Sequence, residues 1–336
     1  MDYTKTTDIP SPIRTYYDKR LLQRLLPRLI HKAAAEMRPL KMRSGDQIKF
    51  RRIESLAAQT APLEEGVTPS PLVLDDTQIT STIGQYGGYS IITDMVQMTD
   101  LDPIISETVG LMGEMMGNTV DQTIASVINA GTNYIRVTAT NVGSTSGART
   151  VVDNGVFTPY HLRAAVSTLE NANVEKIQTM IKTGSGYDSS PIPEAYLCFI
   201  HPTIAQWIRG GGTTYWAPAT SGFIPVQHYA SYSSLYPGEI GAHVSGVRFI
   251  MSTNVKTWAA ASADSTTVYS NLVVGKGFYA CTEMEGGVRT YVHDRKTEGG
   301  PLEQRSTVGA IVEHVTTILN DSCACRIECE SKLAGT

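Results

Sequence analysis

The segment 103–130 carries the most regular pattern in this sequence. Its apolar and small side chains recur every four residues, as expected for one buried stripe on a helix: Ile104, Thr108, Met112, Met116, Val120, Ile124 and Ile128. Asp100 or Asp102 is suited to cap the N-terminus, and Pro103 suits the first helical position. Gly131 follows the pattern as a C-cap glycine would. At 1.5 Å per residue this helix is on the order of 40 Å long.

Two extended runs precede the helix. Residues 47–53 alternate between apolar and polar side chains, which is the period of a strand. A second run covers 72–93, and a polar, proline-containing stretch lies between the two at 57–71. We therefore predict a long two-stranded excursion. Because an isolated hairpin is marginally stable in water, it is expected to pack on something else.

The N-terminal segment 13–35 has the pattern of a basic amphipathic helix that Pro27 kinks or restarts. Its apolar stripe includes Leu22, Leu25 and Leu29. Such a helix can bind a membrane surface or a partner. We favour an arm whose leucines lie on another part of the same protein or on a neighbouring copy, since stripes of this kind usually bury against protein.

From residue 159 onward, short helices and strands alternate. Helices are predicted at 159–173 and 202–209. Strands are predicted at 195–200, 247–252 and 268–274. The whole chain is therefore expected to belong to the α+β class.

A last strand at 322–330 alternates cleanly, with three of the five cysteines on one face. Cys325, Cys329 and His314 are candidate ligands of a zinc site, but their spacing matches no tight Cys-x-x-Cys knuckle. We favour cysteines that act as small buried apolar side chains.

The composition excludes several classes of protein. With 336 residues, 41% hydrophobic and 18% charged, the chain is expected to be globular and largely ordered. A net charge of -4 lacks the basic excess of a dedicated nucleic-acid binder, so any DNA contact must be local. No secretory signal and no apolar run of membrane-spanning length is found, which predicts synthesis and retention in a cytoplasm.

Signatures of catalysis are missing from the sequence. Phosphate-binding loops, dinucleotide-binding loops, His-Glu-x-x-His and Gly-x-Ser-x-Gly do not occur. The pairs Glu64-Glu65 and Asp75-Asp76 are adjacent in extended segments, so their side chains point to opposite faces and do not form a dyad. We expect no catalytic, cofactor-binding or metal-binding residues and no enzymatic activity.

Five short motifs in order resemble one family, together with the arm and the long helix. They lie at 45–52 (GDQIKFRR), 85–89 (QYGGY), 199–202 (FIHP), 238–250 (GEIG followed by GVRFI) and 301–309 (PLEQR followed by TVG). They are similar to the major capsid proteins of tailed double-stranded DNA phages of the N-four type, a branch of the Hong Kong 97-like capsid fold. This chain departs from the family at Gly300-Pro301-Leu302, where the family often has an acidic residue before the proline, and at Ala310-Ile311, where it often has Trp-Lys.

The resemblance implies a division of the chain into five segments. Residues 1–44 would be an N-terminal arm, and 45–93 an extended hairpin, the E-loop. Residues 94–152 would form the peripheral domain with its spine helix, and 153–285 the axial domain. Residues 286–336 would return to the peripheral domain.

The resemblance also implies a structural function. Copies of the chain would form hexamers and pentamers of an icosahedral phage head that encloses double-stranded DNA, with the hairpin lying over a neighbouring subunit. The implied partners are the chain itself, packaged DNA bound non-specifically, a separate scaffolding protein, a portal and decoration proteins, but no membrane. The protein would be located in the virion after assembly in the host cytoplasm.

Charged residues of the hairpin are the expected contacts between subunits, beside the leucines of the arm. Lys49, Arg51 and Arg52 lie at the hairpin base, whereas the loop region carries Glu64, Glu65, Asp75 and Asp76. About 20 residues per arm of the hairpin extend up to roughly 70 Å. We therefore expect the opposite charges to meet between copies, where they would fix the register of the contact.

Three alternatives stay open at this point. An encapsulin-like protein compartment would share the fold and load enzymes in place of DNA. A self-cross-linking shell, which some relatives form through Lys-Asn isopeptide bonds, would make Lys49 the donor. A soluble hydrolase is disfavoured by the missing motifs.

Overall fold

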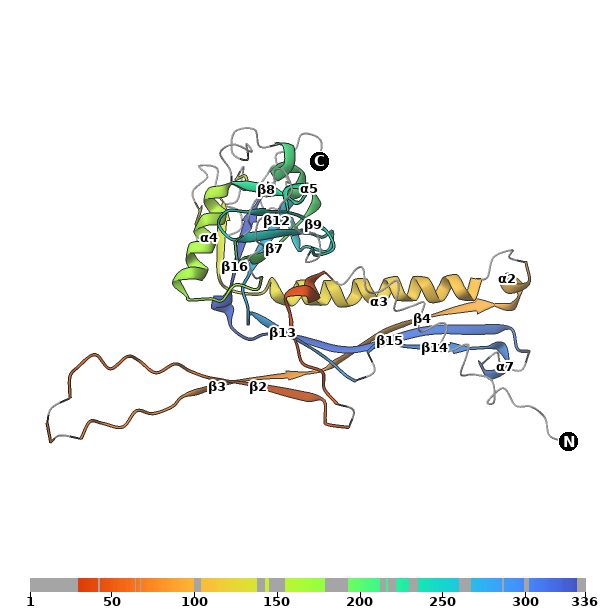
Figure 1. Ribbon diagram of the computed structural model, residues 1–336. Helices are drawn as coiled ribbons and strands as arrows, with labels where there is room; N and C mark the ends of the chain where they lie inside the picture. The colour runs from red at the N-terminus through yellow and green to blue at the C-terminus, as the bar shows by residue number, and fades with distance from the viewer. Residues whose placement is uncertain are drawn as a thin grey trace.

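The structure is a computed structural model with three recognisable parts (Figure 1). It describes residues 30–41, 43–63, 65–66, 68–99, 104–137, 143–144, 155–178, 193–211, 216, 222–229, 235–259, 267–285, 287–298 and 302–330. We call the compact α+β part the body, the long helix with its sheet the wing, and the segment 46–82 the hairpin. The hairpin and the free end of the wing point in opposite directions.

The wing is one long helix lying on a five-stranded sheet (Figure 1). The helix α3 spans Ile104–Ile128, as the sequence predicted to within a residue or two. The strand order is β1-β13-β15-β14, and β4 pairs with the other edge of β15. The bounds are β1 Glu36–Met37, β4 Gly84–Thr93, β13 Tyr279–Glu283, β14 Arg289–His293 and β15 Arg305–Ile318. Two short helices, α2 (Asp94–Thr99) and α7 (Arg295–Glu298), lie at the free end.

The predicted stripe of α3 is buried against one face of this sheet. Met116, Val120 and Ile124 are almost fully buried, in one apolar cluster with Val308 and Val312 of β15. Alternate residues of β15 point to the helix, so that half of its 14 residues serve the core. The opposite face of the sheet has no helix on it among the described residues.

The body is built on a nine-stranded mixed sheet, ordered β6-β5-β16-β12-β7-β10-β9-β8 with β11 paired to β12. The bounds are β5 Tyr134–Val137, β6 Gly143–Ser144, β7 Tyr196–Ile200, β8 Phe223–Pro225, β9 Glu239–His243, β10 Val247–Met251, β11 Thr257–Ala259, β12 Thr267–Val274 and β16 Ala324–Cys329. The helix α4 (Pro159–Asn171) packs on one face through Leu162, Val166 and Leu169. A further helix, α5 (Pro202–Gln206), continues into a π-helical turn at Trp207–Gly211.

The two faces of the body sheet serve different cores. On β7, Cys198 and Ile200 join the cluster under α4, whereas Leu197 and Phe199 join the cluster of α3 and β15. This division follows the two-residue period of a strand. The cluster of α3 and β15 therefore contains residues of both the wing and the body, and it joins the two parts.

The hairpin pairs β2 (Gln47–Ile53) with β3 (Asp76–Thr82) in antiparallel register. The alternation expected from the sequence is present, with Phe50 buried and Lys49 and Arg51 exposed. Between β2 and β3 the described residues form no strand, and this segment projects as an extended loop (Figure 1). The chain passes from β3 through Ile83 directly into β4 of the wing.

Sheet membership differs from the expected segments in several places. Residues 84–93 belong to the wing sheet and not to the hairpin. The strand β5 lies in the body although 94–152 was expected to form the peripheral domain with the spine helix. The strand β13 lies in the wing although 153–285 was expected to form the axial domain. Within 286–336, β15 lies in the wing but β16 returns to the body. Strand pairing joins residues far apart in sequence, which local periodicity does not report.

The predicted arm helix at 13–35 lies largely outside the described residues. What is described of it is a 3-10 turn at His31–Ala34, followed by β1, which pairs in parallel with β13. The backbone N–H of His31 and its ring both contact Asp121 of α3, with Nδ1 2.9 Å from Oδ1. The ring Nδ1 forms no hydrogen bond, so the backbone N–H of His31 supplies the hydrogen bond to Asp121. The root of the N-terminal segment is thus fixed to the wing helix.

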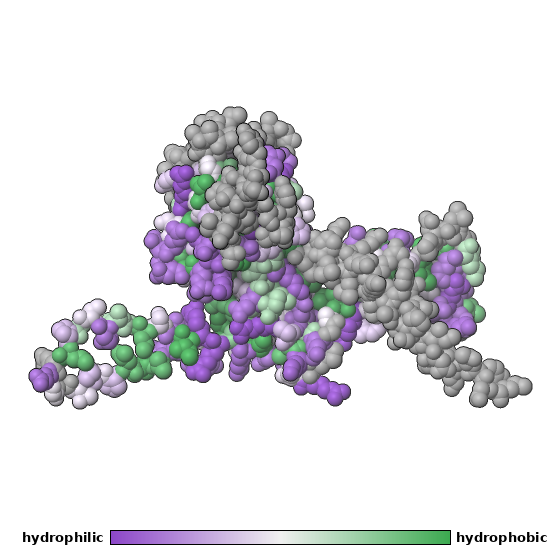
Figure 2. Space-filling view, in the orientation of Figure 1, coloured by the Kyte–Doolittle hydropathy of each residue, from purple (hydrophilic) through white to green (hydrophobic). Residues whose placement is uncertain are grey.

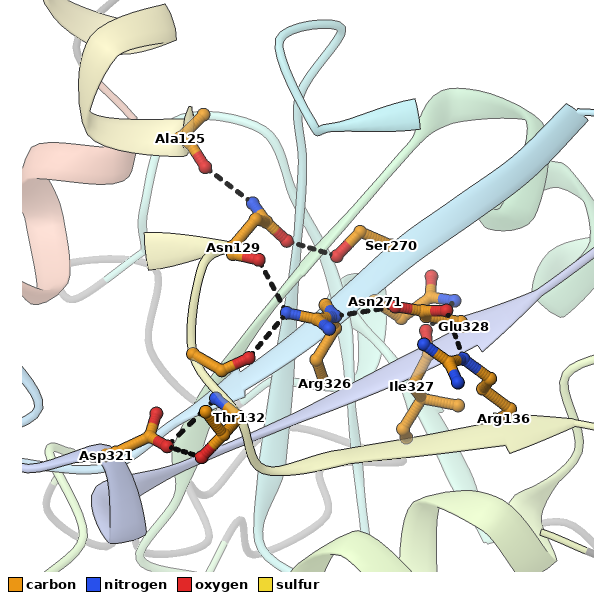
Figure 3. Close-up of polar contacts among 11 residues, drawn as sticks. Ala125, Asn129, Thr132, Arg136, Ser270, Asn271, Asp321, Arg326, Ile327 and Glu328 are labelled. Carbon is orange, nitrogen blue, oxygen red and sulfur yellow. Dashed lines mark hydrogen bonds and ion pairs between the residues drawn. The ribbon is translucent and has the colours of Figure 1, made fainter. Parts of the chain in front are cut away.

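A charged network is buried in the body sheet (Figure 3). Glu328 of β16 is fully buried and binds two cations, Arg326 through Nε at 2.9 Å and Arg136 of β5 through Nε at 3.0 Å. Arg326 also donates to the carbonyls of Asn129 and Gly131 at the end of α3. The Arg136 guanidinium lies 4.2 Å from the ring centre of Tyr134. Arg326 and Glu328 share the face of β16 opposite Cys325, and that face is buried as well.

All five cysteines are free and buried. His314 lies in the wing and Cys325 and Cys329 in the body, so the three do not come together as a zinc site. Within the described part of the chain, no group of His, Cys, Asp or Glu is arranged to hold a metal ion. Burial raises the pKa of Cys281 to about 11 and those of Cys325 and Cys329 to about 12.

These thiols are expected to resist alkylation in the native protein. Their raised pKa values leave almost no thiolate at neutral pH, and burial denies access to reagents. Iodoacetamide at pH 7.5, followed by intact-mass analysis, should add no label before unfolding and five labels in denaturant. A thiol that is labelled in native protein within minutes would contradict this burial.

Candidate functional site

Two apolar surfaces stand out, because nothing in the described structure covers them. No helix among the described residues is long and apolar enough to cross a membrane. The first surface is the outer part of the hairpin, and the second is the sheet face of the wing opposite α3. We describe each in turn.

The outer hairpin exposes a set of large aliphatic side chains (Figure 2). Their exposed fractions run from 49% to 78%. They are Ile53, Leu56, Leu63, Leu72, Val73 and Leu74. Scattered apolar residues on a surface need no explanation, but here they gather on an excursion without a core of its own.

The charges at the hairpin base are paired within the hairpin. Arg51 binds Asp76 across the strands, with Nε 2.7 Å from Oδ2, and Arg52 binds Glu54, with Nη2 2.7 Å from Oε1. A hydrogen bond from Gln78, then the charge and hydrogen bond of Arg51, lower the pKa of Asp76. The expectation that these opposite charges stay far apart was therefore wrong for Arg51, because the register brings Asp76 beside it. Arg52 is paired instead with Glu54 on its own side of the hairpin.

The remaining predicted contact residues divide into two groups. Lys49 and Glu65 are exposed on the hairpin. Glu64, Leu22, Leu25 and Leu29 lie outside the described residues. Their role in contacts between copies stays a prediction.

The second surface is a hollow of about 510 Å³ in the uncovered face of the wing sheet. Its centre is a row across three strands, in which Gly309 of β15 stands between Tyr89 of β4 and Tyr291 of β14. Gly87 and Ile311 continue the floor. A Cβ at Gly87 would lie 2.9 Å from the carbonyl oxygen of Ala310, so a side chain there would disturb the sheet.

The rim of the hollow combines aromatic and polar groups. Tyr89 is 73% exposed and Tyr291 42% exposed. At one end Arg289 forms an ion pair with Glu313, which also accepts a hydrogen bond from Gln85 Nε2 at 3.1 Å. An apolar floor with aromatic walls and a polar edge is suited to bind aliphatic side chains of another protein segment.

The QYGGY motif at 85–89 is divided between the two faces of the sheet. Tyr86 and Gly88 face α3, where Tyr86 stacks on His314 and Gly88 lies against Met115. Gly87 and Tyr89 face the hollow. The sequence singled out this motif but missed Tyr291 and Ile311 of the same hollow. The two-residue alternation of 305–318 was the available signal, but it does not tell which strands lie beside it.

Known proteins resemble this chain in fold and not in sequence. No family model matches it, and no curated protein matches it. The capsid of Ralstonia phage GP4 superposes with a TM-score of 0.66 at 12% identity, covering 91% of this chain and 89% of that one. The capsid structure of cyanophage P-SCSP1u gives 0.61 at 14% identity, covering 90% and 89%. The capsid asymmetric unit of cyanophage Pam1 gives 0.57 at 14% identity, covering 92% and 93%.

Proposed function

We propose that this chain, which has the Hong Kong 97-like fold of phage capsid subunits, is a major capsid protein that assembles with copies of itself into the shell of a phage head. The observation that carries the proposal is the outer hairpin. Its aliphatic side chains are exposed in the single chain, on a segment that cannot bury them itself. A second copy of the same chain offers the matching surface.

The matching surface is the hollow of the wing. The hairpin projects away from the wing of its own chain, so it does not cover its own hollow (Figure 1). Contact between the hairpin of one copy and the wing of the next uses two different surfaces, which is a heterologous contact. Repeated contacts of this type close into rings and shells when the rotation permits.

The energy of such a contact supports cooperative assembly. Full burial of one Val or Leu side chain contributes about 1.5–3 kcal/mol, before the cost of ordering the loop and the partner. One hairpin therefore contributes a modest free energy of association, and in a closed shell this contribution is repeated at every subunit. We also propose that the copies form hexamers and pentamers, that the shell is icosahedral and that it encloses double-stranded DNA.

Partners other than the chain itself are proposed on the family resemblance. A separate scaffolding protein, a portal and decoration proteins are the candidates. Because the net charge is -4, contact with packaged DNA is proposed to be local and non-specific. Assembly is proposed to take place in the host cytoplasm.

The proposal is tested by electron microscopy of the purified full-length protein. We expect closed particles of uniform size, in which the hairpin of each subunit lies over the wing of a neighbour. Particles from infected cells should contain DNA, whereas enzyme cargo would favour the encapsulin-like alternative. A monodisperse monomer of 36.4 kDa under all assembly conditions would overturn the proposal.

A further inference from the structure

His314 lies where β15, α3 and β4 meet, and the proposed assembly assigns it no role. It lies on β15 and is almost completely buried, at 3% exposure. Its Nε2 is 2.9 Å from the hydroxyl of Thr123 on α3, and its ring stacks on Tyr86 of β4 at 4.9 Å between centres. Because β4 continues directly from the hairpin, this histidine touches both the wing helix and the strand that carries the hairpin.

The hydrogen bond to Thr123 makes Nε2 of His314 a donor. The Thr123 hydroxyl lies 2.8 Å from the carbonyl oxygens of Thr119 and Val120, to which it donates. Its oxygen then accepts from Nε2–H of His314. The stacked tyrosine and the aliphatic neighbours of β15 provide no counter-charge.

The charged groups around His314 are already engaged. Glu283 stands opposite it on β13, but the carboxylate of Glu283 binds Lys32 at the root of the N-terminal segment. Asp121, two residues before Thr123 on α3, binds His31 and Asn254. The next residue of β15, Glu313, binds Arg289. A proton added to His314 would place a second cation beside Lys32 without a free carboxylate to receive it.

Burial lowers the pKa of His314, the Glu283 carboxylate opposes this, and the Lys32 ammonium adds to it. The net direction is downward from the ordinary value. A group whose pKa is lower in the folded than in the unfolded state takes up protons on opening, so stability is lost as the pH falls. For His314 this loss begins below about pH 6.5, the ordinary value for histidine.

We propose that His314 is an acid-sensitive switch at the junction of the hairpin-bearing strand, the wing helix and the N-terminal root, and that its protonation loosens the packing of α3 on β4 and β15. The proposal concerns the single chain and is independent of the capsid function. It makes the angle between hairpin and wing responsive to pH.

The test is hydrogen exchange with mass spectrometry on the full-length protein at pH 7.5 and 5.5, corrected for the intrinsic exchange rate. In wild type, amides of 84–93, 112–124 and 305–318 should lose protection at pH 5.5 relative to pH 7.5, because the open state takes up the proton more readily than the packed one. His314→Gln should remove most of this difference. His293→Gln on β14, a partly exposed histidine, is the matched control and should behave as wild type.

A second variant keeps the histidine. Glu283→Gln removes the carboxylate that favours its protonation and so lowers the pKa of His314 further in the packed state. The loss of protection between pH 7.5 and 5.5 should therefore be larger than in wild type. Protection in wild type that does not change with pH would overturn the proposal. The proposal is also overturned if His314→Gln retains the full pH dependence or, should that variant not fold, if Glu283→Gln loses no more protection than wild type.

Discussion

Replacing Val73 and Leu74 together by aspartate is expected to abolish particle formation and to leave the subunit folded. Both side chains are largely exposed in the single chain, at 78% and 67%, so the substitutions remove no internal packing. In the proposed contact each copy would have to bury two carboxylates in an apolar hollow, which is strongly unfavourable without paired cations. Negative-stain microscopy and analytical sedimentation measure the assembly, and thermal unfolding measures the fold.

The matched control is Ser70→Asp with Thr68→Asp, which adds the same charge to the same loop at positions that are already polar and exposed. This variant should still assemble. Normal particles from the Val73 and Leu74 variant would contradict the proposed role of the outer hairpin. Failure of both variants would mean that net charge on the loop, and not its apolar side chains, decides assembly.

Glu328→Ala is expected to produce the largest loss of stability from a single substitution. It would leave Arg136 and Arg326, which are both nearly buried, without their shared carboxylate. Removing one partner from a buried pair typically costs about 3–5 kcal/mol, because the remaining charge is not compensated. Chemical denaturation of the dissociated subunit measures the free energy of unfolding.

Two comparisons separate the cause of that loss. Lys276→Ala breaks an exposed pair with Glu175 and should leave the unfolding midpoint essentially unchanged. Glu328→Gln keeps the shape and some hydrogen bonds but not the charge, so it should be destabilised as well. If Glu328→Ala unfolds at the same denaturant concentration as wild type, the network does not stabilise the body sheet.

The candidate surfaces were only partly predictable from the sequence. The hairpin was predictable, because two strands with little apolar surface and a polar stretch between them indicate a hairpin that packs on another part of the protein or on another copy. The hollow was not, because Tyr89 lies far from Tyr291 and Gly309 in the sequence, and only strand register brings the three residues into one row. Register also placed Asp76 beside Arg51, against the expectation of distant charges.

The sequence by itself determined the elements whose signal is local. The stripe of α3, the alternation of β2 and the strands at 196–200, 247–251 and 267–274 follow from side-chain periods of 3.6 and 2 residues. The tertiary structure alone decided which sheet each strand joins, as β5, β13 and β16 demonstrate. It also decided that both faces of β16 are buried, so that Arg326 and Glu328 have to satisfy each other in the interior. The physical reason is that periodicity shows which side chains share a face, whereas burial depends on what distant segments bring to that face.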